Sequence, residues 1–284
     1  MSLERIAVLG AGIMGRGIAY AAAVAGYETT LYDASPAALA RGEAEIRALM
    51  DKGVAAGKLE AAVRDRARLA AHAELVDATH DADLVIEAIP EDMRLKTDTF
   101  AELDARTKPE AILATNTSSL SITEMAGATK RPDRVVGMHF FNPVHRMRLL
   151  EVVRGLETSE ATIEAASVVG MRMGKECVVV REAPGFVTTR VNALIGNEAF
   201  RMLEEGVASA RDIDKALKLG LNHPMGPFEL VDLVGLDTRL SILTFLHETL
   251  GERYRPNNLM VQYVKAGRLG RKSGKGVYEY GEGA

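Results

Sequence analysis

Near its start the chain reads Arg5-Ile6-Ala7-Val8-Leu9-Gly10-Ala11-Gly12-Ile13-Met14-Gly15. The apolar run 5–9 predicts a strand, the glycines predict a tight turn, and the alanine-rich segment 18–25 predicts a helix. A second apolar run, 28–32, ends at Asp33. Strand, glycine turn, helix, second strand and terminal acid together form the Gly-x-Gly-x-x-Gly pattern of a dinucleotide-binding βαβ unit.

Each glycine of this pattern has its own physical role. Gly10 permits the tight turn, Gly12 lets the backbone approach a pyrophosphate, and Gly15 lets the helix pack closely on the strand. The helix N-terminus then offers free N–H groups and a partial positive charge. We therefore expect the cofactor phosphates to lie against the backbone of Gly10, Ala11, Gly12, Ile13, Met14 and Gly15.

Asp33 indicates which dinucleotide binds. Its carboxylate can accept hydrogen bonds from the adenosine ribose diol and would repel a 2′-phosphate. No arginine follows it directly, because the next residues are Ala34-Ser35-Pro36. The sequence therefore predicts NAD rather than NADP. The alternative, an ordinary βαβ turn, is disfavoured because every element of the required context is present.

Composition limits the possible classes of protein. The 284 residues allow one large or two ordinary domains, and 47% of them are hydrophobic, enough for a sizeable core. The net charge of −4 does not suggest a nucleic-acid or membrane-surface binder. The single cysteine, Cys177, excludes an intrachain disulfide and a cysteine-based metal site, and its strand context predicts a buried thiol.

Several absences indicate where the protein works. No apolar stretch approaches the length of about 18 residues that a membrane span needs. The N-terminus enters the first predicted strand without a separate basic region, apolar region and cleavage site. No metal site is predicted. We expect a cytoplasmic protein.

The first part of the chain alternates strands and helices. Residues 36–70 have a helical, charged composition with glycine interruptions. Further predicted helices are 93–107, 121–126 and 159–173, and predicted strands are 84–89, 111–115, 134–141, 149–153 and 176–180. This βαβα order predicts an α/β fold with a Rossmann-like, doubly wound sheet.

The pattern changes at Ala183-Pro184-Gly185, after which helices dominate. They are predicted at 187–203, 210–219, 229–233, 237–250 and 259–266, and the one candidate strand is 276–280. We predict two domains, 1–184 for NAD binding and a smaller all-helical domain, 185–284, for substrate binding and dimerisation. The long helix 187–203 has few charges, so it either faces a partner or forms the centre of its own domain.

A candidate catalytic pair comes from two adjoining strands. His139 lies near the C-terminal end of an apolar run, where open α/β sheets place their ligands. Glu151 lies twelve residues further on, and antiparallel pairing through 142–147 would bring it level with His139. A carboxylate at one ring nitrogen would leave the other as a general base. The alternatives are a core histidine, and a salt bridge from Glu151 to Arg148 or Arg146.

Polar residues also follow two other strands. In Asn116-Thr117-Ser118-Ser119, Asn116 and Ser118 are well placed to bind a substrate oxygen or the nicotinamide. Ser119 or Ser121 can instead cap the next helix. Glu91 and Lys96 follow the strand 84–89, where they either reach the cofactor ribose or serve as a helix N-terminal acid and a solvated lysine.

These residues as a set carry a family resemblance. The motifs are Gly10–Gly15, Val85-Ile-Glu-Ala-Ile-Pro-Glu91, Asn116-Thr-Ser-Ser-Leu120, His139-Phe-Phe-Asn-Pro143 with Glu151, Ala183-Pro-Gly-Phe-Val187, Leu219–Glu229 and Gly267–Gly276. Together they resemble the L-3-hydroxyacyl-CoA dehydrogenases, most closely the bacterial 3-hydroxybutyryl-CoA dehydrogenase branch. The likeness covers almost the whole chain.

The resemblance implies roles for individual residues. His139 matches the general base, Glu151 its orienting carboxylate, and Ser118 a serine near the substrate hydroxyl and nicotinamide. Asn142, Glu91 and Lys96 match positions that contact NAD. Lys272 matches a lysine of a C-terminal segment that closes on the cofactor.

The chain departs from the family pattern at one substrate position. Where the family commonly has an asparagine that binds the substrate carbonyl, this chain has Thr189, in Gly185-Phe-Val-Thr-Thr-Arg190. Asn192, on roughly the same helix face, is the other candidate. The family lysine that binds the CoA phosphates has no clear counterpart, and Lys52 and Lys58 lie in the right region.

The resemblance implies reversible, NAD-dependent oxidation of a 3-hydroxyacyl-CoA to the 3-oxoacyl-CoA by a homodimer that pairs through its C-terminal domain. Two alternatives stay open. One is a β-hydroxyacid dehydrogenase that acts on a free acid, a class that often uses a catalytic lysine. The other is a non-catalytic dinucleotide-binding protein of the same fold, against which the intact His139, Glu151 and Ser118 argue.

Overall fold

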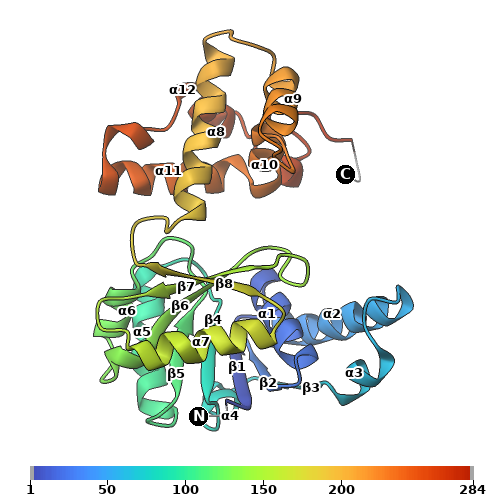
Figure 1. The fold of residues 1–284 in the computed structure, drawn as a ribbon, viewed down its shortest axis with the longest axis vertical. Helices are drawn as coiled ribbons and strands as arrows, with labels where there is room; N and C mark the ends of the chain where they lie inside the picture. Colours follow the sequence, from blue (N-terminus) through green and yellow to red (C-terminus); the bar gives the residue numbers. More distant parts are fainter. Residues whose placement is uncertain (1–2, 282–284) are drawn as a thin grey trace. The chain divides into compact units, whose positions relative to one another are not determined.

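The computed structural model describes residues 3–281. The chain forms two compact units, Met1–Ala183 and Pro184–Ala284, each of which is considered by itself (Figure 1). The predicted domains, 1–184 and 185–284, differ from this division at Pro184 alone.

An eight-stranded sheet forms the centre of the first unit. Its order is β3-β2-β1-β4-β5-β6-β7-β8, and all neighbours are parallel except β6 and β7. The strands are β1 (Arg5–Leu9), β2 (Glu28–Tyr32), β3 (Arg68–His72), β4 (Leu84–Glu87), β5 (Ile112–Thr115), β6 (Val135–Phe140), β7 (Leu149–Arg154) and β8 (Glu176–Arg181). The six parallel strands have the Rossmann order, so the predicted fold class is confirmed.

Helices cover both faces of this sheet. They are α1 (Ile13–Val24), α2 (Pro36–Ala55), α3 (Ala61–Arg66), α4 (Leu75–Thr79), α5 (Met93–Arg106), α6 (Ile122–Gly127) and α7 (Glu160–Arg172). On one face α1, α2 and α7 share a core with alternate strand residues. On the other face, Ile122 of α6 packs against Gly137 of β6. His139 lies two residues beyond Gly137 and therefore projects from the same face as Gly137.

The glycine turn between β1 and α1 is built as the motif predicts. Gly10 has a φ of +96°, which an L side chain rarely adopts. A Cβ at Gly15 would overlap the carbonyl oxygen of Gly10, so only glycine lets α1 begin this close to the strand. A Cβ at Gly12 would meet no atom within 4 Å, so the space over the turn is open.

The prediction that residues 36–70 are helical is wrong at its C-terminal end. α2 stops at Ala55, α3 is short, and residues 68–72 form β3, a strand that the sequence did not indicate. The sequence Arg-Leu-Ala-Ala-His contains no β-branched residue. Because β3 lies at the sheet edge and pairs with β2 alone, tertiary pairing overrides its weak strand preference.

The second unit contains helices and no strand within the described residues 184–281. The helices are α8 (Thr188–Glu204), α9 (Ala210–Gly220), α10 (Pro227–Val234), α11 (Leu236–Leu250) and α12 (Asn258–Lys265). Their core includes Phe200, Phe228 and Leu243. The buried face of α8 joins this core, whereas Val187 and Val191 at its N-terminal end are each 52% exposed.

The candidate strand 276–280 is wrong, because this segment makes only isolated bridges. Its backbone is anchored by a side chain instead. Asp232, which is 1% exposed, accepts hydrogen bonds from the N–H groups of Val277 (2.8 Å) and Tyr278 (2.9 Å). Its carboxylate also accepts from the Tyr280 hydroxyl, and burial with this partner raises the pKa of Tyr280 to about 12. The buried carboxylate of Asp232 therefore satisfies two backbone N–H groups that would pair with a neighbouring strand in a sheet.

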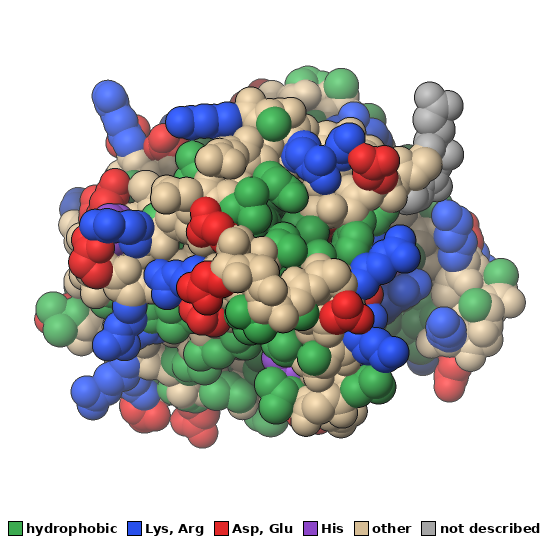
Figure 2. Space-filling view, turned by 90° about the horizontal axis from the view of Figure 1, so that it is seen from above, with side chains coloured by type: hydrophobic (Ala, Val, Ile, Leu, Met, Phe, Trp, Pro, Cys, Tyr) green, Lys and Arg blue, Asp and Glu red, His purple; other side chains and the backbone are tan. Residues whose placement is uncertain are grey.

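The surface carries both signs of charge. Figure 2 shows Lys and Arg side chains interspersed with Asp and Glu side chains on the face drawn, with hydrophobic side chains exposed between them. None of the helices in residues 3–281 has the length and apolar character that crossing a membrane requires.

Cys177 is half-buried rather than buried as predicted, and burial raises the pKa of its thiol.

Candidate active site

The carboxyl ends of β1, β4, β5 and β6 meet at one edge of the sheet, because these strands are parallel. The glycine turn follows β1, the Glu91 loop follows β4, and Asn116–Ser119 follow β5. A Cβ at Gly10 would collide with the carbonyl of Ala88, so the first two loops touch. Most of the predicted N-terminal site residues therefore lie in one region, where open α/β sheets bind their ligands.

The His139–Glu151 pair forms as its spacing predicts. β6 and β7 are antiparallel with His139 opposite Glu151, and the imidazole Nδ1 lies 2.7 Å from the carboxylate Oε2. The two side chains are 8% and 1% exposed. Arg148 pairs with Glu176 instead of Glu151. The ring of Phe141 packs against the imidazole of His139, with ring centroids 4.4 Å apart.

This geometry determines what the pair can do. An ionised carboxylate only accepts hydrogen bonds, so Nδ1 carries the proton and Nε2 carries the lone pair. The buried negative charge beside the ring stabilises the imidazolium that forms when Nε2 takes a proton. The arrangement is that of a general base with a fixed tautomer.

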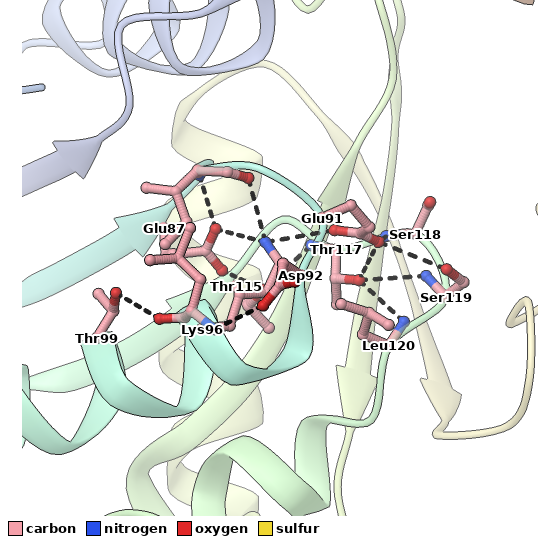
Figure 3. A network of polar contacts seen from close by, with 12 residues as sticks. Glu87, Glu91, Asp92, Lys96, Thr99, Thr115, Thr117, Ser118, Ser119 and Leu120 are labelled. Carbon is pink, nitrogen blue, oxygen red and sulfur yellow. Dashed lines mark hydrogen bonds and ion pairs between the residues drawn. The ribbon is translucent and has the colours of Figure 1, made fainter. Parts of the chain in front are cut away.

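Glu91 organises the loop that follows β5 (Figure 3). Its Oε1 accepts hydrogen bonds from the hydroxyl of Thr117 (2.5 Å) and the N–H of Ser118 (3.2 Å). The Thr117 hydroxyl in turn accepts from the N–H groups of Ser119 and Leu120. The hydroxyl of Ser118 points away from Glu91 and makes no hydrogen bond within residues 3–281. It is thus available for a ligand.

Lys96 is not the solvated lysine that one interpretation of the sequence proposed. It is 1% exposed, and its ammonium lies 2.6 Å from Glu87 and 3.3 Å from Glu91. Glu87, which is fully buried, was missed as a site residue. Its signal was present in the sequence, because it is a charged residue at the end of an otherwise apolar strand.

Asn116 holds two strands in register. Its amide oxygen accepts a hydrogen bond from the N–H of Phe140 (2.9 Å), which leaves the amide NH₂ group for other partners. The predicted cap is Ser121, whose hydroxyl accepts from the N–H of Glu124 at the start of α6. Ser119 lies instead near Glu91, at 3.5 Å.

Asn142 is exposed and lines a cavity of about 150 Å³ between α1, α2 and the loop 142–145. Ile13 and Arg16 of α1 form the opposite wall, and Arg16 pairs with Glu45 of α2 at 2.5 Å. His145, a second residue that the sequence did not single out, also lines the cavity. Burial and then the charges of Arg146, Lys175 and Lys58 lower the pKa of His145, which indicates a positive potential at this place.

Asp33 lies directly after β2 with both carboxylate oxygens fixed. Oδ2 accepts from the N–H of Ala11 and Oδ1 from the N–H of Ser35, each at 2.8 Å. Each oxygen can accept a further hydrogen bond. The acid therefore stands beside the glycine turn, as the motif requires for ribose recognition.

The remaining predicted residues belong to other elements. Lys52 is exposed in the last turn of α2, and Lys58 is exposed in the loop after it. Three residues belong to the second unit: Thr189 and Asn192 lie near the start of α8, and Lys272 pairs with Asp237 at 2.6 Å. Within residues 3–281, no group of three or more His, Cys, Asp or Glu side chains is arranged to hold a metal ion.

Comparison with known proteins identifies the family. Residues 5–183 match the model of the 3-hydroxyacyl-CoA dehydrogenase NAD binding domain, and residues 185–280 match the C-terminal domain of the same enzymes. The chain belongs to the 3-hydroxyacyl-CoA dehydrogenase family. The family and NAD predictions are thereby confirmed, as is the prediction of an NAD-dependent enzyme.

Individual members of the family match over their full length. The chain is 47% identical to a probable 3-hydroxybutyryl-CoA dehydrogenase of Bacillus subtilis, with 99% of each chain covered. It is 46% identical to a 3-hydroxybutyryl-CoA dehydrogenase of Bradyrhizobium diazoefficiens, covering 98% of this chain and 96% of the relative. The crystal structure of (S)-3-hydroxybutyryl-CoA dehydrogenase from Ralstonia eutropha superimposes with a TM-score of 0.95 at 42% identity, covering 99% of this chain and 100% of that one.

Proposed function

We propose that this enzyme reversibly oxidises a short-chain 3-hydroxyacyl-CoA, such as 3-hydroxybutyryl-CoA, to the 3-oxoacyl-CoA, with the His139–Glu151 pair as its general base. The observation that carries the proposal is the 2.7 Å contact between these side chains. The contact lies at the edge of the sheet where the glycine turn of a dinucleotide site also ends.

The chain's residues fit NAD and have defined tasks in the reaction. The open space over Gly12 admits the pyrophosphate, and the carboxylate of Asp33 suits the ribose diol. Bound NAD would supply the hydride acceptor for the oxidation at C3 of the substrate. His139 Nε2 takes the proton of the 3-hydroxyl group, and Glu151 stabilises the resulting imidazolium. The Ser118 hydroxyl donates a hydrogen bond to the substrate oxygen, and Asn142 and Glu91 contact the cofactor.

Two groups of residues are proposed to hold the acyl-CoA. Thr189 or Asn192 donates to the substrate carbonyl, in place of the family's asparagine. Lys58, with Lys52 nearby on the same segment, attracts the CoA phosphates. The positive potential that lowers the pKa of His145 supports this assignment, because Lys58 is one of its sources.

A substrate comparison tests the proposal. The purified enzyme is assayed with acetoacetyl-CoA, longer 3-oxoacyl-CoA esters and free acetoacetate, each with NADH and NADPH in parallel. We expect rapid oxidation of NADH with acetoacetyl-CoA, and far slower reaction with the free acid and with NADPH. Activity on free acids alone would favour the β-hydroxyacid dehydrogenase alternative. Binding of NADH without any turnover would favour the non-catalytic alternative.

A homodimer that pairs through the second unit is also proposed. Val187, directly before α8, and Val191 within it are each 52% exposed, and Leu219 of α9 is 77% exposed, so this unit presents large apolar side chains that a partner could cover. We expect light scattering at micromolar concentration to give twice the mass of one chain, and a monomer mass would contradict the proposal.

A cytoplasmic location is proposed as well, in keeping with the single cysteine.

A further inference from the structure

We propose that Glu87, Lys96 and Thr117 are positioning residues, which hold Glu91 and the Ser118 loop in place for nicotinamide binding and hydride transfer. This inference rests on the proposed function, in which Glu91 contacts the cofactor and Ser118 contacts the substrate. It also gives Lys96 a different task from the direct cofactor contact that the family resemblance implies.

Glu87 is the fixed end of the arrangement. It is fully buried at the last position of β4, and each of its carboxylate oxygens is used. Oε1 accepts from the Lys96 ammonium (2.6 Å) and the N–H of Ile89 (2.7 Å), and Oε2 accepts from the hydroxyl of Thr115 (2.7 Å). These bonds tie the end of β4 to α5 and to the end of β5.

Lys96 connects the buried carboxylate of Glu87 to the carboxylate of Glu91 at the site. Its ammonium is 3.3 Å from Glu91, whose side chain is 41% exposed. The same ammonium therefore fixes Glu91, which on a solvent-exposed loop would otherwise sample several rotamers. Figure 3 shows Glu87, Lys96 and Glu91 in sequence, leading from the strand to the Thr117–Ser118 loop.

Thr117 transmits the position of Glu91 to the loop. It is 2% exposed and donates to Glu91 at 2.5 Å, while the backbone N–H of Ser118 donates to the same carboxylate oxygen. The backbone on which the Ser118 hydroxyl stands is thus set by Glu91. A shift of Glu91 would displace both a cofactor contact and a substrate contact, and a displacement near 1 Å can cost about 100-fold in rate.

Replacing both Glu87 and Lys96 with uncharged residues distinguishes a positioning role from a purely structural one. Buried ion pairs often contribute little net stability, and replacing both charges with uncharged groups of similar size is often neutral or stabilising. A neutral pair would thus preserve the fold. It would not preserve the bridge to Glu91, because an uncharged side chain at position 96 cannot form an ion pair with that carboxylate.

The test is the double variant Glu87→Gln/Lys96→Met, compared with the wild type in melting temperature, NADH affinity by fluorescence titration, and kcat and KM with acetoacetyl-CoA. The glutamine keeps an amide that can bond to Thr115 and the N–H of Ile89. We expect a melting temperature close to that of the wild type, with NADH affinity and kcat each lower by about 10- to 100-fold. Unchanged NADH affinity and kcat in the folded variant would overturn the proposal.

A second variant keeps the proposal testable if the double variant does not fold. Thr117→Val leaves the ion pair intact and removes the hydroxyl that donates to Glu91 and accepts from the N–H groups of Ser119 and Leu120 within the loop. We expect a similar loss of kcat, and wild-type kcat would overturn the proposal. The matched control is Asp104→Asn, which removes the charge from the largely buried Asp104–Arg131 pair (9% and 11% exposed). It should lower the melting temperature without changing NADH affinity.

The two proposals can fail separately. The NADH titration requires no acyl-CoA, so it reports on the positioning of Glu91 even if the substrate is not the proposed one. Absence of turnover by the wild type with acetoacetyl-CoA would count against the proposed function alone.

Discussion

His139→Gln should lower kcat for acetoacetyl-CoA reduction by about 10²–10⁴-fold, the usual contribution of a general acid–base residue. Glutamine retains an amide that can bond to Glu151, but it has no group that exchanges a proton at neutral pH. NADH affinity should change little, because the fingerprint turn and Asp33 are untouched. Steady-state kinetics and fluorescence titration on the same preparation check both parts.

The control for this variant is His80→Gln. His80 is exposed beyond the end of α4, where its ring contacts the backbone oxygen of Val76. It should have wild-type kinetics. Turnover by His139→Gln at a rate close to that of the wild type would show that another residue moves the proton.

Glu151→Gln should cause a loss of similar order in kcat, about 10²–10⁴-fold, because Glu151 contacts the proposed base His139. A glutamine amide at this place can donate to Nδ1, which favours the tautomer with the proton on Nε2 and so removes the base. The charge that stabilises the imidazolium is also lost. Measurement of kcat, and of KM for NADH and for acetoacetyl-CoA, should show the loss mainly in kcat.

Glu176→Gln is the matched control, because Glu176 lies on the neighbouring strand β8 and pairs with Arg148 at the surface. Its removal should leave kcat unchanged, since exposed ion pairs contribute little. Should Glu151→Gln retain most of its kcat, the carboxylate would have a structural role alone, and the base would work without an orienting partner.

Local patterns in the sequence predict much of the fold and the catalytic pair. The glycine turn follows from the backbone freedom that Gly10 and Gly15 provide. The spacing from His139 to Glu151, with a turn at Asn142-Pro143, predicts an antiparallel register that the structure contains. In both cases the deciding interactions lie within a few residues or between consecutive strands, where the sequence carries the information directly.

Other features depend on contacts between distant segments. The sequence places Lys96 on the predicted helix 93–107, but its burial follows from the packing of α5 against Glu87 and Glu91. Residues 68–72 form the strand β3 because their backbone pairs with the edge of β2. The segment 276–280 resembles a strand in sequence, yet the N–H groups of Val277 and Tyr278 donate to the side chain of Asp232. No local pattern reports which distant side chain will satisfy a backbone group.

We propose that His139 and Glu151 act as one unit in the reaction with NADH. This proposal is tested most directly by single-turnover oxidation of NADH with acetoacetyl-CoA in the wild type, His139→Gln, Glu151→Gln and the double variant. Because Glu151 works only through the imidazole, the double variant should be about as slow as His139→Gln alone. Losses that simply multiply, or a wild-type rate in the double variant, would contradict the account.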